Sequence, residues 1–341
     1  MTKSPEPGSN EWLAQVSEDI IDPDQRIIDP HHHLWSGPAL SRGAYLLEDL
    51  WADTGAGHRV EKTVFVECRA AYRKDGPKHL RPLGETEFVR QQAEASDQDQ
   101  GQATIAGIVG HADLTLGESV AEVLEAHVEL GGGRFRGIRH SGARAKYPET
   151  LRIAGRGPEG LYSNADFRRG MKTLGALGLT YDTWHYHHQN QDFCDLARAC
   201  PDTQMILDHF GTPLGVGPYA GKRDEIFAQW RQDIAEIAKC SNVVAKMGGL
   251  AMPDNGFGWD LRATPATSDE FCEAQRPYYL HTIECFGPER CMTESNFPVD
   301  KLSISYPVLY NGLKKILAEF SSDERDAMFY GTANRVYRLD E

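Results

Sequence analysis

Residues 26–35 read RIIDPHHHLW, and this stretch decides between two classes of α/β fold. The run Arg26–Asp29 is typical of a short buried β-strand. In an open doubly wound sheet, the first strand is usually followed by a glycine-rich turn that binds phosphate. Because histidines follow the strand here, the stretch favours the other class, a closed barrel of parallel strands.

Seven more strand-like runs follow, separated by amphipathic stretches. The runs lie at Lys62–Glu67, Ala103–Val109, Arg134–Arg139, Leu179–Trp184, Gln204–Asp208, Asn242–Met247 and Arg290–Glu294. The stretches predict helices at Leu46–Trp51, Glu85–Ala95, Gly117–Leu130, Ala165–Leu177, Asp192–Ala199, Arg223–Lys239, Asp269–Phe286 and Leu302–Phe320. Eight such units predict an α/β protein with a (β/α)8 TIM barrel at residues 26–341, after an N-terminal extension of residues 1–25.

Composition excludes several kinds of partner. The 341 residues include 36 Lys and Arg against 50 Asp and Glu, a net charge of -14, which argues against nucleic acid and anionic membranes. The seven cysteines are widely spaced without a C-x-x-C pair, which argues against a disulfide framework and a cysteine zinc cluster. We therefore expect a cytoplasmic protein that binds a small molecule, without an organic cofactor, and leave a homo-oligomer open.

In a TIM barrel, the active site lies at the carboxyl ends of the strands. Most of the histidines fall there, together with other polar residues: His31 and His33; Glu67; His111 and Asp113; Arg139 and His140; His185, His187 and His188; Asp208 and His209; Lys246; and Glu294 with Asn296. We expect these ends to form one site. Trp35 and Trp184 stand beside the histidines, as pocket walls or as core residues.

Strand alternation predicts which of these side chains face each other. A period of two puts His31 and His33 on one face, and Glu294 and Asn296 on one face of the last strand. His209 adds a third imidazole. Such a group can share a metal ion or a substrate oxygen, although buried histidines that serve only the fold are the alternative.

Five motifs spread over the chain resemble the amidohydrolase superfamily. They are D-x-H-x-H-x-W at Asp29–Trp35, G-I-R-H at Gly137–His140, the spacing of Asp182–Gln189, L-D-H-x-G at Leu207–Gly211 and S-x-F-P at Ser295–Pro298. The resemblance is to the branch of amidohydrolase-related TIM barrels that includes sugar-lactone and 2-pyrone-4,6-dicarboxylate lactonases. It implies a hydrolase that attacks a carbonyl carbon with activated water.

The resemblance also implies metal ligands. Carried over, the superfamily pattern falls on His31, His33, His187, His209 and, at the last strand, Asn296. An asparagine is a weak ligand and no base, so position 296 departs from the aspartate of many relatives. Either Glu294 replaces that carboxylate and one divalent ion binds, with Zn²⁺ first, or the histidines polarise the substrate carbonyl without a metal.

The preferred function is hydrolysis of a lactone, with Glu294 or Asp208 as the base and His31, His33 and His209 around the carbonyl. Arg139 is expected to bind a substrate carboxylate or an oxyanion, or else to form an ion pair with a neighbouring acid. His140, His187, Gln189, Trp35, Trp184, Lys246 and Asn296 are the other candidates for substrate binding. Lys246 could instead pair with Glu67.

Two other functions stay open: metal-dependent decarboxylation of an aromatic or dienoic acid, and a barrel without catalysis. The segment Gly248–Ser268 has no clear element of its own. It is either a mobile loop over the pocket or an excursion packed on the rim of the barrel.

Overall fold

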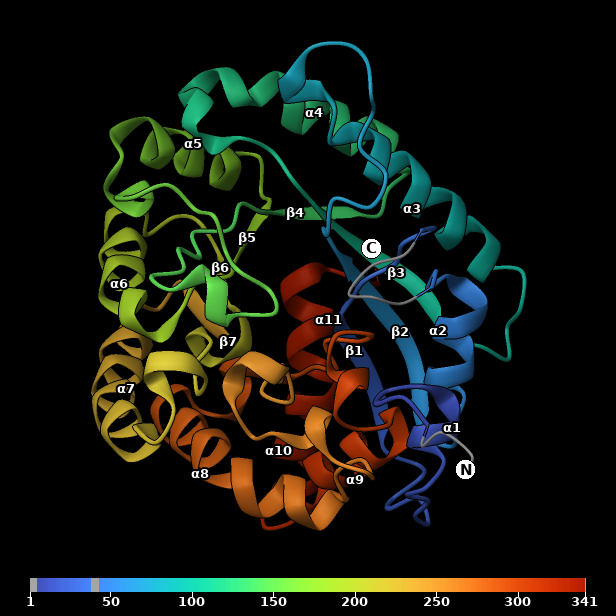
Figure 1. Ribbon diagram of the computed structural model, residues 1–341. Helices are drawn as coiled ribbons and strands as arrows, with labels where there is room; N and C mark the ends of the chain where they lie inside the picture. Colours follow the sequence, from blue (N-terminus) through green and yellow to red (C-terminus); the bar gives the residue numbers. More distant parts are fainter. Residues whose placement is uncertain (1–4, 38–42, 341) are drawn as a thin grey trace.

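The computed structural model describes residues 5–37 and 43–340, and within them eight parallel strands pair in chain order (Figure 1). The strands are β1 (Arg26–His32), β2 (Arg59–Val66), β3 (Thr104–Gly110), β4 (Phe135–Arg139), β5 (Thr180–Thr183), β6 (Met205–Leu207), β7 (Val243–Met247) and β8 (Cys291–Thr293). Each coincides with a predicted run. The predicted (β/α)8 barrel is therefore confirmed.

Helices surround the strands. They are α1 (Asn10–Leu13), α2 (Leu47–Thr54), α3 (Leu83–Ser96), α4 (Ala121–Leu130), α5 (Ala165–Ala176), α6 (Asn190–Ala199), α7 (Arg223–Ala238), α8 (Ser268–Phe286), α9 (Tyr306–Ile316), α10 (Ser322–Asp326) and α11 (Thr332–Tyr337). Two predicted helices are shorter than expected. Gly117 has φ 61° and delays α4 to Ala121. Ser305 has an extended backbone, with φ -80° and ψ 155°, so α9 begins only at Tyr306.

The barrel closes between its last and first strands. Asn296 N donates to His31 O at 3.0 Å, and His33 N donates to Phe297 O at 2.8 Å. Behind this seam, the buried Asp29 carboxylate accepts hydrogen bonds from Ser295 Oγ at 2.5 Å and from Tyr306 at 3.0 Å. The seam holds the ends of β1 and β8 side by side, where histidines and acidic groups were expected to meet.

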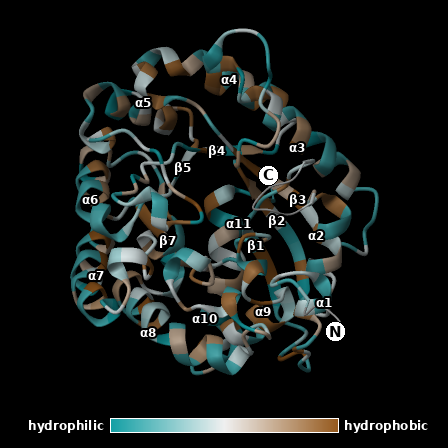
Figure 2. Ribbon diagram, viewed as in Figure 1, coloured by the Kyte–Doolittle hydropathy of each residue, from teal (hydrophilic) through white to brown (hydrophobic). Residues whose placement is uncertain are grey.

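Apolar residues form an outer and an inner core. The outer core lies between strands and helices, and Figure 2 shows hydrophobic residues along the strands and on the helices around them. The inner core fills the barrel with Ile28, Val64, Val66, Val109, Ile206, Val244 and Met292. These side chains pack against the C-terminal residues Tyr330, Ala333, Val336, Tyr337 and Leu339.

The C-terminal segment closes the amino end of the barrel. Lys62 Nζ, near the start of β2, donates to Leu339 O at 3.1 Å, and Arg26 at the start of β1 lies 3.7 Å from the ring centroid of Tyr330. Figure 1 shows α11 in the middle of the ring of strands. Among the described residues, the C-terminal segment therefore covers the amino end, which leaves the opposite, carboxyl end for a ligand.

The segment 248–268 packs on that carboxyl rim. Leu250 and Trp259 are buried, and the Asp254 carboxylate accepts hydrogen bonds from Arg152 N at 2.7 Å and Ile153 N at 2.9 Å. The interpretation as a packed excursion is the one that the structure supports. No helix among the described residues is both long and apolar enough to cross a membrane.

Candidate functional site

A charged layer lies directly above the apolar layer inside the barrel. Asp208, Lys246 and Glu294 each follow an inner-core residue by two positions, namely Ile206, Val244 and Met292. Since strand side chains alternate, both members of each pair point into the barrel. Arg139 and Asp182 join the layer from the ends of β4 and β5.

Three residues form the centre of this layer. Glu294 Oε1 accepts a hydrogen bond from His209 Nδ1 at 2.7 Å, and Glu294 Oε2 lies 2.8 Å from His31 Nδ1. The two imidazole rings are 4.5 Å apart, and all three side chains are buried. One ligand atom of each lies within 4.8 Å of the others, a spacing that suits one metal ion.

Two cations flank His31. Arg139 Nη1 lies 3.2 Å from His31 Nε2, and Lys246 Nζ lies 3.5 Å from His31 Nδ1. Arg139 also pairs with Glu67 at 3.1 Å, so the predicted ion pair with a neighbouring acid is present. Lys246 pairs with Asp182 at 2.7 Å and Asp208 at 3.2 Å. The interpretation of Lys246 as a partner of Glu67 was wrong, because the alternation of β7 directs it to the barrel axis.

The carboxylates of the layer outnumber its cations. Two cations, Arg139 and Lys246, face four carboxylates, which are Glu67, Asp182, Asp208 and Glu294. When all four carboxylates are ionised, the layer carries a net charge of two negative units. Neither oxygen of Asp208 has an aligned hydrogen-bond donor among the described residues. Burial raises the pKa of Asp208 to about 7 and that of Glu294 to about 8. The layer therefore takes up protons near neutral pH or accommodates a divalent cation.

The histidines of the site are neutral near pH 7. Burial lowers the pKa of His209 to about 3, and it holds the pKa values of His31 and His33 well below their usual range. Lys246 lowers the pKa of His31 further, and Arg139 does the same for His33. Neutral imidazoles are the form that binds metals and accepts protons.

Backbone geometry turns His209 toward Glu294. After β6, His209 and Phe210 adopt left-handed conformations, with φ 53° and 57°. Such conformations are costly for residues other than glycine and concentrate at functional sites. The turn also requires glycine at two neighbouring positions, because a side chain there would clash. A Cβ atom at Gly249 would lie 2.2 Å from His209 Nδ1, and one at Gly248 would lie 2.4 Å from Glu294 Cγ.

His33 stands beside the cluster and not within it. Its Nδ1 lies 2.7 Å from Val66 O, which fixes the proton on Nδ1, and its ring centroid is 5.0 Å from that of His31. Trp35 stacks on His33, with centroids 6.5 Å apart. The indole and the imidazole together form one wall at the carboxyl end of β1.

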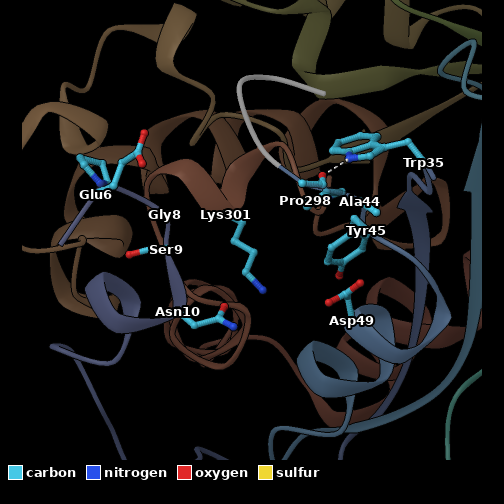
Figure 3. Close-up of a pocket in the computed structure, with 12 residues that line it drawn as sticks. Glu6, Gly8, Ser9, Asn10, Trp35, Ala44, Tyr45, Asp49, Pro298 and Lys301 are labelled. Carbon is cyan, nitrogen blue, oxygen red and sulfur yellow. Dashed lines mark hydrogen bonds between the residues drawn. The ribbon is translucent and has the colours of Figure 1, made fainter. Parts of the chain in front are cut away.

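Trp35 also borders a cavity of about 400 Å³ between the N-terminal segment and the loop after β8. Figure 3 shows Lys301 extending into it beside Tyr45, with Asn10 opposite. The Lys301 ammonium already binds both oxygens of Asp53, at 2.9 and 2.8 Å. The cation of this cavity is thus paired.

A family model described as Amidohydrolase matches residues 28–339. The chain belongs to the amidohydrolase family. A relative from Sinorhizobium fredii, the uncharacterized protein y4mH, is 34% identical over 343 residues, which cover 93% of this chain and 99% of the relative.

A second relative is a lactonase. The L-fucono-1,5-lactonase of Burkholderia multivorans is 29% identical over 241 residues, which cover 70% of this chain and 74% of the relative. A solved amidohydrolase from Burkholderia multivorans with bound HEPES has a TM-score of 0.70 and 25% identity, over 92% of this chain and 99% of that one. A second crystal form of that protein was solved with bound zinc.

Several residues implied by the amidohydrolase resemblance lie outside the central cluster. His187 Nδ1 accepts a hydrogen bond from Leu214 N at 3.2 Å, and its ring packs against Tyr219. Gln189 bonds the backbone of Gly142 at 2.8 Å, so it braces the loop after β4. The third histidine of this region, His185, lies between Thr183 and Asn190, 3.0 Å from each. None of the three joins His31 and Glu294.

Two more candidates lie on the rim near β4 and β5. His140 Nδ1 accepts a hydrogen bond from Leu114 N at 3.2 Å, and its ring lies 5.0 Å from that of His111. Trp184 packs in a small cluster with Tyr186, and its indole N–H has no hydrogen-bond partner among the described residues.

Asn296 departs from the expected strand face. β8 ends at Thr293, and Asn296 has φ 56°, so the alternation that was predicted to align it with Glu294 stops before it. Its Nδ2 donates to Asp300 Oδ1 at 2.8 Å. An aspartate here would put two carboxylates together, and burial already raises the pKa of Asp300 well above its usual range. Asp300 is a physical reason for asparagine at this position.

Sequence reasoning missed three contributors to the site. Asp182 was noted only for its spacing to Gln189, although it binds Lys246. Alternation along β5 would have identified it. Gly248 and Gly249 carried no sequence signal beyond their composition, because the close contacts come from β6 and β8.

Proposed function

We propose that this amidohydrolase hydrolyses a small lactone at the carboxyl end of its barrel. The observation that carries the proposal is the 2.7 Å hydrogen bond between His209 Nδ1 and the buried Glu294 carboxylate. When Glu294 is ionised, the proton of the neutral His209 imidazole lies on Nδ1, so Nε2 is free to accept a proton and a carboxylate stands behind the ring.

The proposed reaction uses His209 to move one proton. Its Nε2 takes a proton from water while the water oxygen attacks the lactone carbonyl carbon. Glu294 stabilises the imidazolium that forms. When the ring C–O bond breaks, His209 returns the proton to the ring oxygen, and the product is a hydroxy acid. Glu294, which the sequence suggested as the base, then acts through His209, because it is fully buried.

Arg139 is the proposed partner of the carbonyl oxygen or of a carboxylate on the substrate. Its guanidinium lies between Glu67 and His31, and it retains slight exposure of 6%. A planar guanidinium binds an oxyanion with two parallel hydrogen bonds. His33 and Trp35 border the same space, and His140, His187 and Trp184 lie on the rim where a larger substrate would extend. Lys246 is sealed beneath the histidines.

The residues also fit a divalent cation, for which zinc is the first candidate. His31, His209 and Glu294 would hold it, and the two uncompensated negative charges of the layer favour it electrostatically. When bound, such an ion lowers the pKa of water and polarises a carbonyl. With those three groups engaged as ligands, Asp208 is the carboxylate left to accept the proton of water.

The test is a paired assay on the purified protein. Lactones with and without ring hydroxyls and carboxylates are followed by acid release, and a matched set of benzoates by release of carbon dioxide. We expect turnover of lactones that His209→Ala abolishes. Carbon dioxide release in place of acid release would assign decarboxylation instead, and inactivity on both sets would favour a barrel without catalysis.

Metal dependence is measured in the same preparation. Elemental analysis should find about one zinc ion per chain after zinc loading, and His31→Ala should lose it. Equal turnover by chelator-treated and zinc-loaded protein would reject the metal form and retain the His209 mechanism.

A further inference from the structure

The C-terminal helix reaches the charged layer from the closed end of the barrel. Tyr337, the last residue of α11, is fully buried, and its hydroxyl donates to Asp182 Oδ2 at 2.6 Å. Ala333 and Val336 of the same helix pack against the apolar inner core. Tyr337 thus makes a polar link between the floor of the barrel and its active end.

Lys246 connects Tyr337 to the histidines. An ammonium group has three N–H donors, and two carboxylate oxygens and one imidazole nitrogen lie around Nζ. Asp182 Oδ2 lies at 2.7 Å, Asp208 Oδ1 at 3.2 Å and His31 Nδ1 at 3.5 Å. The ring centroid of Tyr337 lies 5.4 Å below the same atom. The position of Nζ is therefore a balance among these three contacts.

Tyr337 weakens the strongest of those three attractions. Asp182 Oδ2 receives both the Tyr337 hydroxyl and Lys246, while Asp182 Oδ1 has no partner among the described residues. Without the hydroxyl, Lys246 would be the only donor to this buried carboxylate, and their charge-assisted bond would strengthen. Nζ would move toward Asp182, and its longest contact, to His31, would be lost first.

We propose that Tyr337 is a positioning residue for the active site, which holds Lys246 at the height where it still contacts His31 and Asp208. This inference rests on the proposed function, because it assigns Lys246 to the arrangement of the catalytic histidines. It gives the C-terminal helix a role beyond filling the end of the barrel.

Tyr337→Phe in the full chain is the test, with Tyr330→Phe as the matched control. Tyr330 belongs to the same plug and packs on Arg26, but its hydroxyl does not touch the charged layer. For the lactone substrate, we expect Tyr337→Phe to lower kcat about tenfold with KM changed less than about twofold, and Tyr330→Phe to leave both within about twofold. Equal losses of kcat in both variants would show that Tyr337 acts only through its packing and would contradict the inference.

A second measurement needs no substrate, so it tests the inference independently of the proposed lactonase activity. In protein with isotope-labelled histidine, the NMR signal of His31 Nδ1 reports its contact with Lys246. It should shift in Tyr337→Phe and not in Tyr330→Phe. Asp182→Asn should shift it in the opposite direction, because Lys246 is then released toward His31. An unmoved His31 signal in Tyr337→Phe and Asp182→Asn overturns the inference, whether or not the protein is a lactonase.

Discussion

Two layers fill the interior of this barrel, and at β6, β7 and β8 they lie two positions apart in the sequence. Ile206 and Val244 belong to an apolar floor that α11 covers, whereas Asp208 and Lys246 belong to a charged layer at the active end. The same alternation directs both layers inward. The two layers therefore differ in the types of residue that point inward and not in the direction of their side chains.

The layers differ in energetic role. Burial of apolar surface stabilises the floor by about 25 cal/mol per Å². Buried carboxylates and imidazoles instead cost free energy unless they are paired, and the charged layer leaves Asp208 without an aligned donor. Substitutions in the floor should lower stability and spare turnover, and substitutions in the charged layer should do the reverse. The following predictions test this division.

The largest effect is expected from His209→Ala. Removal of the proposed base should lower kcat by about 10³-fold or more, without a lower melting temperature. His32→Ala is the control, because His32 faces outward, where Nε2 lies 3.0 Å from Thr63 Oγ1 and the ring packs on Phe65. That variant should lose stability and keep kcat. Steady-state rates and melting temperatures are measured for both variants. Equal rates for the two variants would show that the active site does not lie in the charged layer.

Glu294→Gln should have the next largest effect. The shape is kept, but the charge behind His209 is lost, so kcat should fall about 10²-fold. Asp208→Asn, made alongside and assayed with and without zinc, separates the two candidate bases. A Glu294→Gln enzyme with nearly wild-type kcat, beside an inactive Asp208→Asn enzyme, would transfer the role of base to Asp208.

Asn296→Asp tests why the expected aspartate is absent. The new carboxylate would lie 2.8 Å from Asp300, so we expect a loss of about 1–3 kcal/mol in the free energy of unfolding. The double variant Asn296→Asp, Asp300→Asn exchanges the two groups and should recover most of that loss. Chemical denaturation measures all three proteins. If the single variant is as stable as the wild type, repulsion from Asp300 does not explain Asn296.

Ile206→Val probes the floor. The loss of one buried methylene group should lower the free energy of unfolding by about 0.5–1.5 kcal/mol and leave kcat within about twofold of wild type. Denaturant melts and rates on the same preparation measure both quantities. A fall in kcat as large as that of Glu294→Gln would show that the two layers are not separable.

Glu85→Gln should change how stability depends on pH. Glu85 of α3 accepts hydrogen bonds from Cys68 N and Ala70 N, and burial raises its pKa to about 8. A carboxyl group with a raised pKa stabilises the fold when protonated, and this contribution falls as pH rises toward 8. The stability advantage of wild type over Glu85→Gln should therefore shrink between about pH 5 and pH 8. A constant difference would contradict the raised pKa.

The strands and most of the charged layer follow from local patterns in the sequence. Strand periodicity identified Asp208, Lys246 and Glu294 at the carboxyl ends, and the histidines at the end of β1 were visible in one short stretch. These predictions succeed because alternation is a property of the extended chain and needs no distant contact.

Only the tertiary structure decided how those groups pair. The left-handed turn at His209 and the break at Asn296 depend on neighbours such as Gly249 and Asp300, so alternation fails there. The contact of Tyr337 with Asp182 joins residues 155 positions apart. Pairings of this kind depend on the closed barrel, which brings the strand ends within hydrogen-bonding distance only after the chain has folded.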